Sequence, residues 1–370
     1  MPNLPGGTIL RSRSVTFAPT GGVPMPNSAW QIQFASRDVN GNPIAAVATV
    51  VKPLVAASSP RLLSFQFAED SLGSICAPSH TVTGSTSNAI SQSESPEALP
   101  LLDTGYTLVY PDYEGPYSEY AAGTVEGQIT LDGIRAALHF TQLGLSATTP
   151  VGMWGYSGGA IATAWASSLE ATYAPELKIV AIAHGGTPAV LQGVANNIDT
   201  DTASNAAFFS LVLTAILGIN RAYPTFATPM LNAKGIAAAQ SLANTCGTLS
   251  PLSSVSGTIP DYTTVSDPFS APNVLAVLPL IDLPQTGKTP IAPSIFIYHS
   301  QLDELIPIAD GGDAIVPPWC AAGSHITYYR GVSADHAAFE VTMAPIVEAY
   351  FEAIANGASP VYPPGSTTCN

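Results

Sequence analysis

A serine in a glycine-rich turn is the side chain of this sequence best suited to covalent chemistry. Ser157 lies in the run Gly-Tyr-Ser-Gly-Gly at residues 155–159, which has the form G-x-S-x-G. A short apolar segment precedes the run and good helix formers follow it. On a sharp strand-to-helix turn, a side chain at Gly155 or Gly159 would collide with the backbone, whereas the serine hydroxyl would project above the sheet. The pattern predicts that Ser157 is a nucleophile.

A serine hydroxyl becomes reactive when a base accepts its proton and a carboxylate orients the base. In proteins with this turn, the partners follow in the order Ser, Asp or Glu, then His. Asp303 comes just beyond one predicted strand, and His336 follows the next predicted strand in a loop before a helix. The sequence therefore predicts a triad of Ser157, Asp303 and His336.

Nearby acids and histidines offer alternatives to two members of this triad. Glu304 is adjacent to Asp303, but its side chain is expected to point elsewhere. His299 lies inside the strand before Asp303 and is interpreted as a packed, hydrogen-bonded histidine. His325 opens a strand, so it should lie at the wrong end of the sheet.

Acyl transfer also needs N–H donors where negative charge develops. The amide of Gly158, directly after the nucleophile, is one candidate. The second should follow the strand at 61–67, which favours Asp70, with Glu69 as a near alternative. A carboxylate would repel an oxyanion, so the useful group of Asp70 is its amide or a protonated carboxyl. A simple turn residue is the other interpretation of Asp70.

The elements that position these residues follow an α/β pattern. Apolar or alternating segments predict strands at residues 8–17, 30–36, 43–51, 61–67, 105–110, 151–154, 178–184, 293–299 and 325–330. Helices are predicted at 126–142, after residue 160 and at 336–355. This alternation implies an α/β fold with a mostly parallel sheet covered on both faces. The serine-rich region 71–100 is expected to be a loop.

The alternation stops between residues 188 and 285, where only helical patches are visible. We expect residues 1–187 and 286–370 to form the catalytic domain and 188–285 to form an inserted helical cap. Residues 206–219 are apolar on every face but shorter than the ~20 residues that span a bilayer. They are either an ordinary buried helix or the wall or lid of an acyl-binding pocket. No transmembrane segment is predicted.

Composition limits the function classes. The 370 residues are 46% hydrophobic, with only 10% charged, which predicts a large core and disfavours disorder. Eleven basic residues against 26 acidic ones give a net charge of −15, which would repel nucleic acids and anionic membranes. A neutral or apolar substrate suits this charge better.

The four cysteines, Cys76, Cys246, Cys320 and Cys369, lie far apart with no C-x-x-C pair. This spacing argues against a zinc site and favours two disulfides, whose pairing stays open. Disulfides, few lysines and many prolines are typical of an exported protein. The first residues contain no apolar leader, so we expect a mature secreted chain without its signal peptide.

Several motifs together resemble the secretory lipase family. They are Pro5-Gly-Gly-Thr-Ile-Leu-Arg-Ser-Arg, Glu69-Asp-Ser, Cys76-Ala-Pro-Ser, Pro111-Asp-Tyr-Glu-Gly, Leu131-Asp-Gly-Ile-Arg, the Ser157 turn, Asp303-Glu-Leu-Ile-Pro and His336. The resemblance implies an α/β-hydrolase with a helical cap that hydrolyses acylglycerols and other carboxylic esters without a cofactor. It supports the triad and the donors Gly158 and Asp70. It also implies that Cys76 pairs with Cys246 and Cys320 with Cys369.

The resulting hypothesis is a secreted serine ester hydrolase, specifically a triacylglycerol lipase acting on small-molecule or lipid esters, with a lipid–water interface as a further partner. A short-chain carboxylesterase, deacetylase or peptidase on the same framework is the alternative. A non-catalytic binding protein is the alternative from another class, and the complete set of triad candidates argues against it.

Overall fold

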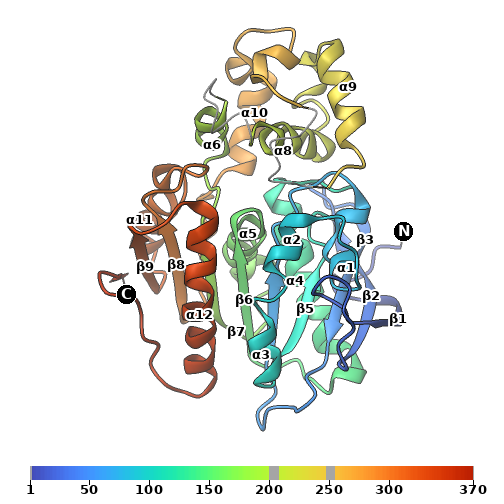
Figure 1. Ribbon diagram of the computed structural model, residues 1–370, viewed down its shortest axis with the longest axis vertical. Coiled ribbons are helices and arrows are strands. Elements are labelled where there is room, and N and C mark those ends of the chain that lie inside the picture. Colours follow the sequence, from blue (N-terminus) through green and yellow to red (C-terminus); the bar gives the residue numbers. More distant parts are fainter. Residues whose placement is uncertain (1, 200–207, 247–254, 370) are drawn as a thin grey trace.

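The computed structural model describes residues 2–199, 208–246 and 255–369. Within them, ten strands form one mixed sheet in the order β1-β2-β3-β5-β4-β6-β7-β8-β9-β10 (Figure 1). Strands β5, β4, β6, β7, β8 and β9 run parallel to one another, whereas β1, β2, β3 and β10 pair antiparallel with their neighbours. The strands are β1 (Ile9–Thr16), β2 (Ser28–Arg37), β3 (Pro43–Val51), β4 (Leu62–Gln66), β5 (Thr107–Pro111), β6 (Val151–Tyr156), β7 (Ile179–Gly185), β8 (Ile295–Ser300), β9 (Ile326–Gly331) and β10 (Thr367–Cys369).

Helices cover both faces of the sheet, as the alternation predicts. Alternate residues of β6 supply two separate hydrophobic cores: Val151 and Met153 enter one, and Trp154 and Tyr156 enter the other. The first core includes side chains of α4 (Gly123–His139), α5 (Ser157–Tyr173) and α11 (Gly312–Ala321). The second includes side chains of α3 (Leu99–Asp103) and α12 (His336–Ala355). The α/β-hydrolase arrangement is therefore built around a sheet buried on both sides.

The prediction that residues 71–100 form a loop was wrong. This region contains η1 (Ser74–Cys76), α1 (Pro78–Thr81), α2 (Ala89–Glu94) and the start of α3. One of its polar residues, Asn88, caps α2. The Asn88 side chain accepts hydrogen bonds from the N–H groups of Ile90 and Ser91 at 3.1 Å each.

Between β7 and β8, the described residues form helices and no strand. The elements are α6 (Leu191–Ile198), α8 (Phe209–Ala222), η3 (Thr228–Met230), α9 (Ala233–Leu242), η4 (Ile259–Tyr262), η5 (Pro268–Ser270) and α10 (Pro272–Ile281). Figure 1 shows α6, α8, α9 and α10 gathered beyond one end of the strands, at the top of the view. Residues 206 and 207, the start of the predicted apolar helix, lie outside the described residues.

Two disulfides join segments that are distant in sequence. Cys76 pairs with Cys246 and Cys320 pairs with Cys369, with Cα–Cα distances of 5.2 and 5.7 Å. The first joins the loop after β4 to the segment after α9. The second joins α11 to β10, and the sequence pattern does not reveal this last strand.

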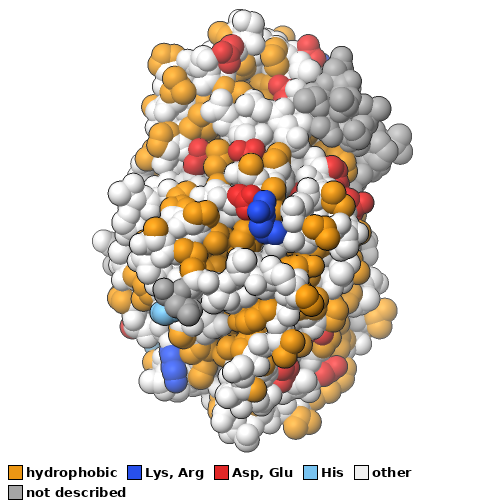
Figure 2. All heavy atoms as spheres, turned by 90° about the vertical axis from the view of Figure 1, so that its left-hand side faces the viewer, with side chains coloured by type: hydrophobic (Ala, Val, Ile, Leu, Met, Phe, Trp, Pro, Cys, Tyr) orange, Lys and Arg blue, Asp and Glu red, His pale blue; other side chains and the backbone are white. Residues whose placement is uncertain are grey.

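The surface carries few charges. In Figure 2, which looks onto the side of α11 and β9, uncharged and apolar side chains dominate and basic ones are rare. Among the described residues, no helix combines the length and apolar character needed to cross a bilayer.

Candidate active site

The turn between β6 and α5 places Ser157 at the first position of the helix, with a φ of +49°. This left-handed conformation is strained for a residue with a side chain. A Cβ on Gly155 would lie within 2.4 Å of the Gly159 carbonyl oxygen, and a Cβ on Gly159 would lie within 2.0 Å of the Gln66 carbonyl oxygen. Both obstacles are backbone atoms, so the glycines are required, as the sequence predicts.

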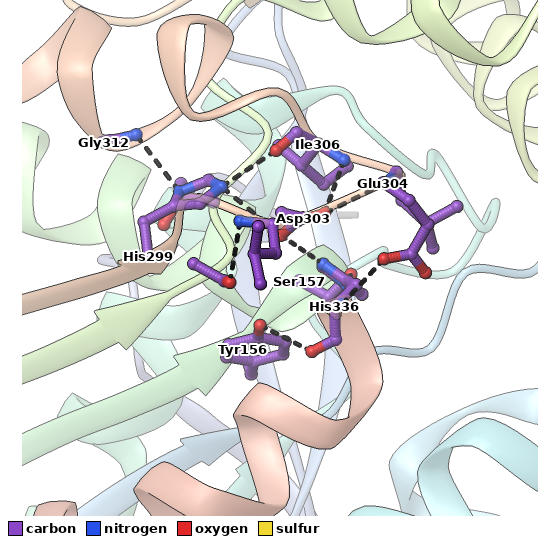
Figure 3. A network of polar contacts seen from close by, with 12 residues as sticks. Tyr156, Ser157, His299, Asp303, Glu304, Ile306, Gly312 and His336 are labelled. Carbon is purple, nitrogen blue, oxygen red and sulfur yellow. Dashed lines mark hydrogen bonds and ion pairs between the residues drawn. The ribbon is translucent and has the colours of Figure 1, made fainter. Parts of the chain in front are cut away.

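The structure brings the three predicted residues of the triad into one hydrogen-bonded relay (Figure 3). Ser157 Oγ lies 2.8 Å from His336 Nε2, and His336 Nδ1 lies 2.7 Å from Asp303 Oδ2. Asp303 comes from the loop after β8, and His336 is the first residue of α12. The geometry allows the imidazole to accept the serine proton while the carboxylate fixes its tautomer.

Burial and charge set the ionisation of this pair. Burial disfavours ionised Asp303, but the neighbouring His336 and His299 outweigh it and hold the pKa of this carboxyl well below its usual value. Its Oδ1 also accepts the N–H groups of Leu305 and Ile306, at 3.1 and 2.8 Å. Burial also disfavours protonated His336, but Asp303 and, to a lesser extent, Glu340 and Glu304 raise the pKa of the imidazole above its usual value.

The structure also places Asp70 against the nucleophile turn. Asp70 has a φ of +48°, and a Cβ on Gly158 would collide with its carboxyl oxygen. Burial raises the pKa of Asp70 to about 6, against the opposing effects of Tyr120 and His336. The backbone of the alternative residue Glu69 has other partners, because its N–H donates to Tyr113 Oη at 3.2 Å and its carbonyl accepts from Asn88 at 2.7 Å. This geometry favours Asp70 over Glu69.

Three further carboxyl groups are buried behind Asp70. They belong to Glu69, Glu114 and Glu126, each at most 1% exposed. Burial, reinforced by mutual repulsion, raises the pKa of each well above its usual value. The loop that carries Asp70 is therefore packed on acids whose protonated forms are favoured by burial.

Two residues that sequence reasoning did not select hold the backbone of His336. Glu304 Oε2 accepts the His336 N–H at 2.9 Å, and the Tyr156 hydroxyl donates to the His336 carbonyl at 2.8 Å. Glu304 thus points away from the imidazole, as expected. The adjacency of Tyr156 to Ser157 and of Glu304 to Asp303 was the only available signal. His325 is exposed and lies outside the relay.

A cavity opens beside Ser157. Ser157 and Asp70 border it, and the rest of its wall is mainly apolar. The helices above the sheet supply most of this wall, through Leu191, Val194, Ala195 and Ile198 of α6, Leu211, Val212, Ala215, Ile216 and Ile219 of α8, and Leu278 and Ile281 of α10. The apolar helix α8 is therefore part of a pocket wall, which was one of the two interpretations of its sequence.

Among the described residues, no cluster of His, Cys, Asp and Glu is arranged to hold a metal ion.

Comparison with protein families shows the family of this chain. A family model described as secretory lipase matches residues 82–361. The chain belongs to the secretory lipase family. It is therefore a hydrolase of a family whose fold is the α/β-hydrolase fold.

Relatives across nearly the whole chain carry lipase names. Lipase 10 of Candida albicans is 32% identical over 376 residues, covering 95% of this chain and 78% of the relative. The secreted triacylglycerol lipase LIP1 of Malassezia furfur is 33% identical, covering 91% and 70%. A Mycobacterium tuberculosis protein described as a probable inactive lipase is 30% identical, covering 92% and 76%.

Solved structures of this fold include Candida antarctica lipase A. That structure superposes with a TM-score of 0.88 at 27% sequence identity, covering 97% of this chain and 84% of the yeast enzyme. A rice cell wall degrading esterase from Xanthomonas oryzae superposes with a TM-score of 0.73 at 18% identity, covering 96% and 100%. The second likeness concerns the fold alone.

Proposed function

We propose that this protein is a secreted serine ester hydrolase that cleaves acylglycerols and other carboxylic esters through an acyl-enzyme on Ser157. The observation that carries the proposal is the relay of Ser157, His336 and Asp303 at the edge of an apolar cavity. The cavity suits an acyl chain, because burying apolar chain surface there removes it from water. The triacylglycerol lipase name of a relative and the two disulfides support the lipid substrate and export respectively.

In the proposed mechanism, Ser157 Oγ attacks the ester carbonyl carbon while His336 Nε2 takes its proton. Asp303 keeps the proton on His336 Nδ1 and stabilises the imidazolium. The amides of Gly158 and Asp70 stabilise the oxyanion. His336 then protonates the leaving alcohol, and water repeats the sequence on the acyl-enzyme to release the acid.

We further propose that residues 188–285 act as a cap on the catalytic domain formed by 1–187 and 286–370. The support is that side chains of α6, α8 and α10 and residues of the sheet domain border one cavity. The cap would then determine which acyl chains fit, and its outer surface would meet a lipid–water interface.

A fluorophosphonate probe tests the chemistry, since it reacts with an activated serine. The native protein should be labelled and Ser157→Ala should not, whereas Ser14→Ala, at an exposed position on β1, should label normally. Absence of labelling in the native protein would favour the non-catalytic alternative, which one relative's description makes relevant.

Rates on p-nitrophenyl esters from acetate to palmitate and on emulsified triacylglycerol test the substrate. If the protein prefers the acetate ester and does not hydrolyse triacylglycerol, the proposed function changes from a lipase to a short-chain esterase.

A further inference from the structure

A second histidine contacts the triad carboxylate. His299, near the end of β8, is completely buried and precedes Asp303 by four positions in sequence. Its Nε2 lies 3.4 Å from Asp303 Oδ2, the same oxygen that receives the His336 Nδ1–H. Figure 3 shows His299 on the far side of Asp303 from Ser157.

The surroundings of His299 fix its tautomer. The Gly312 N–H donates to His299 Nδ1 at 3.3 Å, so this nitrogen carries no proton in the neutral ring. The proton therefore lies on Nε2. It points between the Ile306 carbonyl, at 2.9 Å, and Asp303 Oδ2. His299 is thus a donor to the carboxylate and cannot accept from it.

These contacts close a ring around one peptide residue. The Ile306 N–H donates to Asp303 Oδ1 at 2.8 Å, while the Ile306 carbonyl accepts from His299. His299 and Asp303 therefore hold opposite sides of Ile306 and also face each other. Because β8 is a fully buried strand paired on both sides, by β7 and β9, the ring anchors the Asp303 loop to the sheet.

We propose that His299 is a positioning residue for the triad, fixing the Asp303 carboxylate and limiting its basicity through the Nε2–H. This inference rests on the proposed function. An oriented carboxylate keeps the His336 ring aimed at Ser157, and a donor on its other side weakens its hold on the proton of protonated His336. His299 therefore lowers the pH at which His336 releases that proton.

The ionisable groups near Asp303, His336 and His299 are Asp70, Tyr156, Glu304, Glu340 and His184. Glu304 belongs to the Asp303 loop and Glu340 to α12, and both favour protonated His336. His184 of β7 is the ionisable neighbour of His299, and burial, followed by the proximity of His299, lowers its pKa to about 3, so it stays neutral. These groups are unchanged in the variants below.

Two amide variants separate the two hydrogen bonds of His299, the one from Nε2–H toward Asp303 and the one that Nδ1 accepts from Gly312. In His299→Gln the side-chain amide nitrogen can reach the position of Nε2 and donate to Asp303. In His299→Asn the shorter side chain can accept the Gly312 N–H but cannot reach Asp303. His325→Phe, at an exposed histidine outside the network, is the control for a change of ring.

We expect His299→Asn to lower kcat/KM by ~10- to 100-fold, mainly through kcat, and His299→Gln to recover most of that loss. The acid limb of the pH profile of kcat/KM should move to higher pH in His299→Asn only. Equal kinetics and an equal acid limb in the two amide variants would overturn the proposal, as would native behaviour in His299→Asn.

Proton NMR of His336 Nδ1–H gives a second measurement that needs no turnover. Its titration midpoint should rise in His299→Asn and stay near native in His299→Gln; unchanged midpoints in both would overturn the inference. If the native protein neither hydrolyses esters nor reacts with fluorophosphonate, the proposed function fails, and this titration still decides the role of His299.

Discussion

The Tyr156 hydroxyl donates a hydrogen bond of 2.8 Å to the backbone carbonyl of His336. The two rings also pack against each other, with centroids 5.0 Å apart. Tyr156, directly before Ser157, thus holds the carbonyl of His336, while Glu304, directly after Asp303, holds the N–H of the same histidine. The three triad residues are therefore connected through their neighbours as well as through their own side chains.

Removing the Tyr156 hydroxyl should lower the rate without preventing folding. Tyr156→Phe keeps the ring but loses a hydrogen bond of about 1 kcal/mol, which corresponds to a decrease of ~5-fold in kcat. KM should change little because the hydroxyl contacts His336 rather than the cavity. Tyr328→Phe, which loses a hydroxyl bonded to Asp313, should leave kcat unchanged. An equal loss in both variants would show that Tyr156 has only a structural role.

Asp303→Asn should lower kcat by about 1,000-fold or more, because an amide nitrogen facing His336 Nδ1 favours the wrong tautomer. Glu304→Gln is the matched neighbour. Its amide oxygen can still accept the His336 N–H, so we expect a loss of less than ~10-fold. Steady-state kinetics on one soluble ester compares the two variants. A larger loss in Glu304→Gln would mean that the acid of the triad is assigned to the wrong residue.

The pH profile should report the ionisation of His336. The imidazole must be neutral to accept the serine proton, and its pKa is raised above the usual value of about 6.5 because Asp303, Glu340 and Glu304 outweigh burial. Activity should therefore fall as the pH drops through this raised pKa, with a midpoint above about 6.5. The measurement is kcat/KM across pH, with circular dichroism to show that the fold persists. A rate that stays constant down to pH 5 would contradict the role of His336 as base.

Filling the cavity should change the preferred acyl chain. Ala215 of α8 borders the cavity, so Ala215→Phe should reduce activity on palmitate esters by ~10-fold while sparing acetate esters. Ala237→Phe, at an exposed position of α9, should not change the ratio of the two rates. If Ala215→Phe leaves the ratio unchanged, acyl chains do not occupy this cavity.

Local patterns revealed much of the framework. The strands of the sheet come from apolar or alternating segments, and β6 was recognisable because its glycine-rich end must turn sharply. The order of Ser157, Asp303 and His336 could be read because each follows a strand. The glycines were predictable from the geometry of the turn alone.

The contacts around the triad could not be predicted from local sequence patterns. His299 looked like any buried histidine of a strand, and its role depends on Gly312 and Ile306, which meet it only in the folded chain. The cap of α2 by Asn88 was missed because asparagine also favours loops. β10 was missed because three residues show no period, and its pairing with β9 depends on long-range contact.

The buried acids behind Asp70 have a consequence for the folding equilibrium. In an unfolded chain Glu69, Glu114 and Glu126 are carboxylates near neutrality, whereas burial in the fold raises their pKa values and so favours their protonated forms. Folding must therefore take up hydrogen ions from the medium. This contribution to stability is complete below the unfolded pKa values and is lost as the pH rises through the folded ones. Raising the pH should accordingly destabilise the fold through these three acids, and lowering it toward their unfolded pKa values should strengthen their contribution to stability.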